Sequence, residues 1–232
     1  MKYEVWSHRF AEDIIKANQP LTSLWQEVIE VLADISDDAI IKEFQNPPEF
    51  MPHRRRKDDK PAKRPKSKKS LSVVLNNLID DGLSARSWIP QSAIFQADEE
   101  SDKAWRLDFS KKASETKGEV SGFAVEVAFN HGEAIAWNLM KPSIAAEINH
   151  VDVQTDIGVG IGVVITATEN LKKAGDFDNA VGTYEKVKRY LNPMFQKLTV
   201  PIILVGLEAP ESFHVKNHEI VIGKFEPKSR SR

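Results

Sequence analysis

Two carboxylates stand inside apolar stretches that have the character of neighbouring strands. Asp108 lies near the end of the stretch 105–110, and Glu126 lies in the middle of the stretch 122–131. Side chains alternate between the two faces of a strand, so Glu126 shares its face with an alanine on either side and not with the bulky apolar residues. An acid between two alanines leaves room for a ligand to approach, which indicates an acidic site rather than a solvated surface.

Paired carboxylates on the two strands of a hairpin are suitable ligands for a hard divalent cation such as Mg²⁺, which prefers oxygen donors. The carbonyl of Val127 offers a third oxygen next to Glu126. A cation held in this way can lower the pKa of a bound water and neutralise charge on a phosphoryl group. Taken alone, the pattern also fits a solvent-facing Glu and a strand-end Asp. Cationic residues that could help to hold a phosphate are Lys111, Lys112 and Lys117.

The composition excludes several classes of protein. The chain has 232 residues, of which 41% are hydrophobic and 28% charged, as expected for a globular protein of one large domain. It has no cysteine, which excludes disulfide scaffolds, cysteine-based zinc sites and thiol catalysis. No apolar run approaches the roughly 18 residues of a membrane span, and the N-terminus has no signal-peptide core. A cytoplasmic location is therefore expected.

The periodicity of apolar residues predicts a mixed α/β sheet around the hairpin. The pattern indicates an antiparallel hairpin followed by right-handed crossovers, with a polar loop over 169–180. A glycine, Gly82, is expected to close one helix, and Pro142 to kink or restart another. Helices are expected over 20–34, 37–44, 71–82, 133–140, 144–150 and 184–196, and buried strands over 158–168 and 200–207.

Positive charge is concentrated in one segment, although the whole chain has a net charge of −2. Residues 53–69 contain ten Lys or Arg and two Asp, a local net charge of +8, so the remainder carries −10. The segment is rich in Pro and has no apolar periodicity, which favours a flexible insert. We expect one domain over 1–232, consisting of an N-terminal helical part (1–46), a basic flexible insert (47–70), a core (71–223) and a frayed basic tail (224–232).

The sequence around the two acids resembles the active-site hairpin of the BglII/BstYI type II restriction endonucleases, which have the PD-(D/E)xK nuclease fold. The resemblance covers about residues 71–210. It implies a restriction-endonuclease-like core and a Mg²⁺-dependent enzyme that cleaves double-stranded DNA at a short palindrome. It also implies a homodimer and a cognate DNA methyltransferase in the host. The segments that carry it are Leu107-Asp-Phe-Ser-Lys-Lys, Val125-Glu-Val-Ala-Phe-Asn-His, 78–83, 88–90, 180–186 and 200–208.

The resemblance also implies roles for single residues. Asp108 and Glu126 become the metal-binding acids, with the Val127 carbonyl as a third ligand. Asn130 and His131, at the end of the second strand, become catalytic helpers, although His131 also fits an ordinary position before a helix. In the loop 168–179, which is otherwise an ordinary solvated loop, the expected DNA contacts are Asn179 to an adenine base and Lys172 and Lys173 to phosphates.

Two departures from the family pattern open alternatives. The loop between the acids is longer than in the family, and Lys117 and Glu119 in it are further candidates. The second position after the Glu, usually polar, is Ala128. Either another group orients the attacking water, or the protein is a catalytically weak or inactive DNA-binding protein of the same fold. A third alternative is a protein-interaction domain, in which the 53–69 segment binds anionic partners instead of following the DNA backbone.

Overall fold

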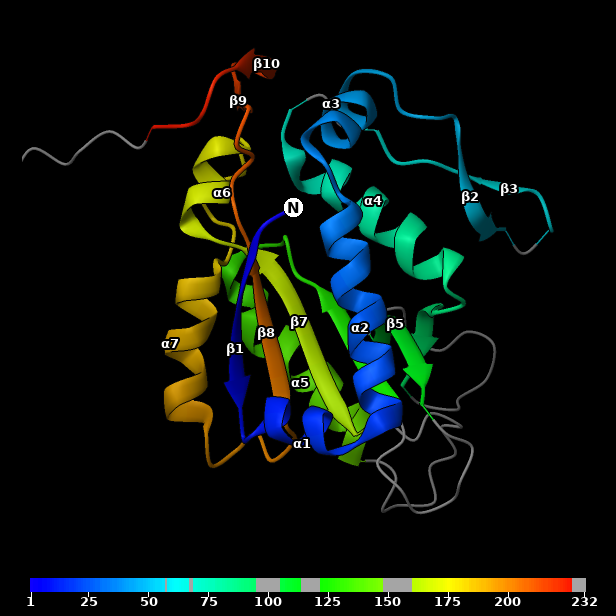
Figure 1. The fold of residues 1–232 in the computed structure, drawn as a ribbon, viewed down its shortest axis with the longest axis vertical. Helices are drawn as coiled ribbons and strands as arrows, with labels where there is room; N and C mark the ends of the chain where they lie inside the picture. The colour runs from blue at the N-terminus through cyan, green and yellow to red at the C-terminus, as the bar shows by residue number, and fades with distance from the viewer. Residues whose placement is uncertain (57, 67–68, 95–104, 114–121, 148–159, 227–232) are drawn as a thin grey trace, which may run out of the picture.

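A six-stranded mixed sheet forms the centre of the molecule (Figure 1). The structure is a computed structural model that describes residues 1–56, 58–66, 69–94, 105–113, 122–147 and 160–226. The strand order is β1-β8-β7-β6-β5-β4. The strands are β1 (Tyr3–His8), β4 (Ile89–Ala93), β5 (Arg106–Lys112), β6 (Gly122–Val127), β7 (Ile161–Ala167) and β8 (Ile202–Leu207).

The direction of the strands confirms the predicted hairpin and the mixed sheet. Strands β5 and β6 are antiparallel, whereas β6, β7 and β8 run parallel. The chain also adds β1 antiparallel to β8 at one edge and β4 antiparallel to β5 at the other, neither of which was expected. The carboxyl ends of the parallel strands β6, β7 and β8 therefore lie at the same end of the sheet. Loops that follow such strand ends commonly carry binding functions.

Helices cover both faces of the sheet, with α2 and α4 on one face and α5 and α7 on the other (Figure 1). Strands β7 and β8 are consequently buried on both faces, which explains why their sequences are continuously apolar. No helix among the described residues is long and apolar enough to cross a membrane. The helices are α1 (Ala11–Ala17), α2 (Gln19–Asp34), α3 (Asp37–Gln45), α4 (Leu71–Ala85), the short 3-10 helix η2 (Gly132–Ala134), α5 (Ile135–Glu147), α6 (Glu169–Ala174) and α7 (Tyr184–Met194).

Three details of the helices differ from the prediction, and in the first two close packing overrides the local signal. Gly82 does not end α4, which continues to Ala85; a Cβ at Gly82 would lie 2.6 Å from a methyl group of Val31, so the glycine allows α2 and α4 to approach closely. Pro142 lies inside one continuous helix, α5, and packs against Gly162 of β7. The polar segment expected as a loop begins with α6, whose first turn is capped by Thr168.

The basic segment 47–70 contains a hairpin, which corrects the prediction of an insert without regular structure. Its strands are β2 (Phe50–Arg55) and β3 (Pro61–Lys63). A second small hairpin, β9 (Phe213–Lys216) and β10 (Glu219–Ile222), follows the central sheet. The tail predicted to fray lies outside the described residues from position 227 onward.

A buried ionic cluster attaches the basic hairpin to α3 and α4. Arg64, whose side chain is 1% exposed, donates to Glu43 at 2.6 Å and to both oxygens of Asp81 at 2.9 and 2.6 Å. Asn77 also donates to Glu43 at 2.8 Å. Nearer the tip, Arg54 pairs with Asp80. Two of the basic residues therefore point inward and hold the hairpin on the helices.

We expect Arg64→Leu to lower the free energy of unfolding by about 3–5 kcal/mol, because it leaves the buried Glu43 carboxylate without its partner. The double variant Arg64→Leu/Glu43→Leu should recover part of this loss. Urea unfolding measures both. The control, Arg55→Leu, changes an exposed arginine of the same hairpin and should stay within about 0.5 kcal/mol of the parent. Equal effects for the two single variants would show that the cluster does not hold the hairpin.

Candidate active site

The two strands of the central hairpin separate at the two acids. Backbone pairing between β5 and β6 runs from Lys112 opposite Gly122 to Phe109 opposite Val125 and goes no further. At the next position the Asp108 carboxylate accepts the Val127 backbone N–H at 2.8 Å. The side chain of Asp108 thus takes over the role of a backbone acceptor, and this draws its carboxylate to the Glu126–Val127 peptide.

Asp108 is also held from its other side by β4. Gln91 donates from its side-chain amide to Asp108 Oδ1 at 3.4 Å. The backbone of Gln91 has a φ of 51°, a left-handed conformation that non-glycine residues rarely adopt and that tends to occur at functional sites. No feature of the sequence pointed to this glutamine, because the strained backbone and the contact across the sheet exist only in the folded chain.

Glu126 lies beneath helix α5 and is almost completely buried, with 2% of its surface exposed. The ammonium of Lys141, on α5, forms an ion pair with Glu126 Oε2 and donates to the carbonyl of Arg106 at 3.1 Å. The other carboxylate oxygen, Glu126 Oε1, is buried and has no hydrogen-bond partner among the described residues. A buried oxygen without a donor is costly, so this atom indicates a ligand.

The environment raises the pKa of both acids. Burial, and then the nearby Asp108, raise the pKa of Glu126 to about 8, and Lys141 limits the rise. Burial also raises the pKa of Asp108, while the Val127 N–H and the charges of Lys141 and Arg54 oppose the increase. Two carboxylates that share a poorly solvated position are the usual arrangement for binding a cation or for acid–base chemistry.

The alanines beside Glu126 do not leave an open space, which corrects the expectation of room for a ligand on that face. Ala124 and Ala128 are both buried. Ala128 packs in an apolar cluster with Leu139 of α5 and Tyr184 of α7. The small side chains admit helix α5 rather than a ligand.

The available atoms fit a hard divalent cation. Asp108 and Glu126 supply carboxylate oxygens, one of which has no partner in the described ranges, and the Val127 carbonyl is the neighbouring backbone oxygen. Such oxygen donors suit Mg²⁺, which keeps several of its own waters and needs few protein ligands. Over the described ranges, no group of three or more His, Cys, Asp or Glu gathers into a self-sufficient metal site.

Asn130 and His131 lie just beyond the end of β6. Asn130 is exposed and exchanges side-chain hydrogen bonds with Asn138 of α5, at 2.8 and 3.5 Å. His131 is exposed, precedes the short helix η2 and forms a bridge with Val181. These contacts join the end of β6 to α5 and to the start of α7, and the described hydrogen bonds do not connect either residue with the two acids.

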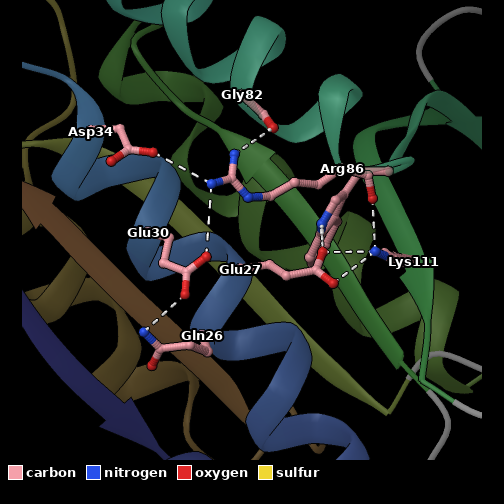
Figure 2. Close-up of polar contacts among 8 residues, drawn as sticks. Gln26, Glu27, Glu30, Asp34, Gly82, Arg86 and Lys111 are labelled. Atoms are coloured by element: carbon pink, nitrogen blue, oxygen red, sulfur yellow. Dashed lines mark hydrogen bonds and ion pairs between the residues drawn. The ribbon is translucent and has the colours of Figure 1, made fainter.

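Lys111 is part of a structural network and faces α2 (Figure 2). Its ammonium donates to both oxygens of Glu27 at 2.9 and 2.7 Å and to the carbonyl of Arg86 at 2.7 Å. Trp88 donates to the same Glu27 at 2.8 Å. A lysine has three N–H donors, and all three are engaged, which disfavours the predicted phosphate contact. Lys112, by contrast, is exposed.

The segment after β7 brings the other predicted DNA contacts to the end of the sheet at which β6, β7 and β8 terminate and near which Glu126 lies. Lys172 donates to the carbonyls of Asn179 and Val181 at 2.7 and 3.1 Å, so it shapes the loop that follows α6. Lys173 and Asn179 are exposed. Lys117 and Glu119 lie outside the described residues. Besides Gln91, sequence reasoning missed Lys141, whose only local signal is a charge within the apolar part of a helix.

Comparison with solved structures identifies the fold. A crystal structure of restriction endonuclease BglII complexed with a DNA 16-mer matches with a TM-score of 0.58 and 19% identity, over 91% of this chain and 78% of that chain. A crystal structure of free BglII matches with a TM-score of 0.48 and 20% identity, over 91% and 81%. A search of curated protein sequences finds no match. The mixed sheet and its flanking helices have the fold of a restriction endonuclease.

A family model described as "Restriction endonuclease BglII/BglIII" matches residues 3–207, nearly the whole chain. The chain belongs to the BglII/BglIII restriction endonuclease family. The resemblance seen in the hairpin sequence is thereby confirmed.

We expect the stability of the metal-free protein to fall as pH rises from about 4.5 to about 8, because folding raises the pKa of Glu126 from 4.5 to about 8. Within this window the folded chain holds a proton that the unfolded chain has released, so stability decreases with pH. Urea unfolding in a chelator, for the parent and Glu126→Gln, measures the effect. The variant should show a weaker decrease, the exposed control Glu219→Gln should follow the parent, and parallel profiles for all three would contradict the assignment.

Proposed function

We propose that this protein is a type II restriction endonuclease that cleaves double-stranded DNA at a short palindromic site by metal-assisted hydrolysis of the phosphodiester bond, with Mg²⁺ as its cation. The observation that carries the proposal is the proximity of Asp108 and Glu126 where β5 and β6 separate, with one buried oxygen of Glu126 that has no partner among the described residues. Membership of a restriction endonuclease family supports this assignment.

In the proposed mechanism, Asp108, Glu126 and the Val127 carbonyl hold the cation. When bound, it would neutralise charge on the scissile phosphate and activate water for in-line attack. The protein contributes a rigid arrangement of the two acids: the Val127 N–H fixes one oxygen of Asp108, and Gln91 contacts the other. Helix α5 excludes water from Glu126, which strengthens its electrostatic interactions. Asn130 and His131 are proposed as helpers at the end of β6.

The surfaces proposed to bind DNA lie at the carboxyl end of the parallel strands, which is also the end of the sheet near the two acids. Lys173 and Asn179 are exposed there, and Lys172 shapes the segment between them; Lys112 is a further candidate. The basic hairpin projects from the same end of the molecule (Figure 1) and approaches the site through Arg54, which lies 5.7 Å from the ring centre of Phe109. The exposed basic residues of this hairpin are Arg55, Arg56, Lys60 and Lys63.

The resemblance of this chain to its family favours a homodimer, because a two-fold symmetric protein matches the two halves of a palindrome. The BglII crystal structure that shares its fold is described as a complex with a DNA 16-mer, and this supports duplex DNA as the proposed substrate. A cognate methyltransferase in the host would protect its own sites.

A second candidate function is a DNA-binding protein of the same fold that cleaves weakly or not at all. The observation that favours it is Ala128, an apolar and buried residue at the position where the family pattern has a polar side chain. Binding of duplex DNA without cleavage of a methylation-free DNA library, in Mg²⁺ or Mn²⁺, would establish this second function and exclude the first.

We expect Asp108→Asn and Glu126→Ala each to reduce the rate of DNA cleavage at least about 100-fold, because loss of a metal ligand removes several kcal/mol of transition-state stabilisation. Cleavage of methylation-free genomic DNA in Mg²⁺ measures the rate, and DNA binding in Ca²⁺ checks that the fold and the interface persist. Glu219→Gln, on the exposed strand β10, serves as the control. Cleavage that survives the change at Glu126 would exclude its assigned role.

Substitutions in the segment after β7 should distinguish contacts to phosphates from contacts to bases. We expect Lys173→Ala to weaken binding to all duplexes and to reduce the slope of log K against log salt by about 0.9. Asn179→Ala should cost about 1–3 kcal/mol on the cognate site only, as expected for a contact to a base. Fluorescence anisotropy over a salt series measures both. An Asn179 variant that weakens all sequences equally would contradict base readout.

A further inference from the structure

Helix α5 brings a lysine to the position that the hairpin itself leaves without a polar group. The second residue after Glu126 is Ala128, which is buried in an apolar cluster that includes Leu139 and Tyr184. A long polar side chain at this position would have to displace that cluster. Lys141, from the same helix as Leu139, reaches Glu126 from above the sheet and pairs with its Oε2.

The sheet is built so that α5 can approach closely enough for this contact. Ala124 of β6 lies opposite Gly162 of β7 in the parallel register, and these two small residues face α5. A Cβ at Gly162 would lie 2.9 Å from the Cβ of Pro142, so even one added methyl group would push the helix away. Pro142 follows Lys141 directly, and its contact with Gly162 therefore sets the height of the lysine above Glu126.

Other contacts fix α5 at both ends of this region. Near its start, Asn138 is hydrogen-bonded to Asn130 at 2.8 Å, which ties the helix to the end of β6. At Lys141 itself, the ammonium donates to the Arg106 carbonyl of β5 at 3.1 Å. Lys141 thus bridges the two strands that carry Asp108 and Glu126, and its side chain is only 11% exposed.

We propose that Lys141 is a positioning residue for the endonuclease reaction: it supplies, from helix α5, the polar side chain that the hairpin lacks at Ala128, and it orients Glu126 for the divalent cation. This inference rests on the proposed function. The geometry divides the two oxygens of Glu126 between two partners. Lys141 holds Oε2, and Oε1, which has no partner in the described part of the chain, is left for the cation.

A competing role for Lys141 predicts the opposite behaviour. If its ammonium only occupied the place of the cation, its removal would free both oxygens of Glu126 and strengthen metal binding. If it orients Glu126, its removal leaves a buried carboxylate free to turn away from the site, and metal binding becomes weaker. Partners of metal-binding side chains commonly change metal affinity by about 10–100-fold when they are lost.

The test compares Lys141→Met and Lys141→Arg with the parent and with Lys197→Met. Lys197 is exposed and precedes β8, so it lies at the opposite end of the sheet from the acids. We expect Lys141→Met to bind Mn²⁺ about 10-fold more weakly by calorimetry and to cleave DNA about 100-fold more slowly at saturating metal. Lys141→Arg, which keeps the charge, should recover part of both losses, and Lys197→Met should match the parent.

Circular dichroism and DNA binding in Ca²⁺ establish that each variant is folded. Tighter binding of Mn²⁺ by Lys141→Met, or cleavage within about threefold of the parent, would overturn the inference. If the parent cleaves no DNA, the proposed function fails, but the Mn²⁺ affinities still decide whether Lys141 positions Glu126. The two hypotheses can therefore fail separately.

Discussion

The cost of keeping the Glu126 carboxylate inside a covered strand determines much of the surrounding structure. The strand β6 is buried on both faces, and an isolated charge in such a position is strongly unfavourable. Three features offset this cost: the ammonium of Lys141, the raised pKa of the acid, and an oxygen that a cation can bind. Asp108 adds a second negative charge close by, so the pair has a strong preference for a positive ligand.

The position of the acids follows from where the hairpin stops being a regular ladder. If β5 and β6 paired beyond Phe109 and Val125, the Val127 N–H would donate to a backbone carbonyl. The Asp108 carboxylate would then not be needed as its acceptor. The separation of the strands exposes backbone groups, and the Asp108 carboxylate satisfies one of them. Both acids lie at this separation of the strands. The candidate site is therefore located where the regular pairing of β5 and β6 ends.

Positive charges in this chain serve two purposes that a count of residues cannot distinguish. Arg64, Arg54 and Lys111 pair with acids of the surrounding helices, and they hold the basic hairpin and the central hairpin in place. The outward residues of the basic hairpin and Lys173 after β7 form no described ion pair with those helices, although Arg56 and Lys60 pair with Asp58 within the hairpin. They remain the proposed contacts to DNA. A segment with a net charge of +8 is thus anchored by some of its charges and leaves others accessible.

The sequence by itself determined the elements whose signals are local. Apolar periodicity located the central hairpin and the helices before and after it, and strand alternation placed Glu126 on the face opposite Val125. The motif around the acids also identified the family. It could not show what covers a face, because that depends on residues far apart in the chain. The alanines predicted a space for a ligand, yet helix α5 fills it. Gly82 and Pro142 were interpreted as helix breaks, although each lies at a close contact within a helix. Lys141 meets Glu126 only because Ala124 and Gly162 let α5 approach the sheet, and only the tertiary structure decides that approach.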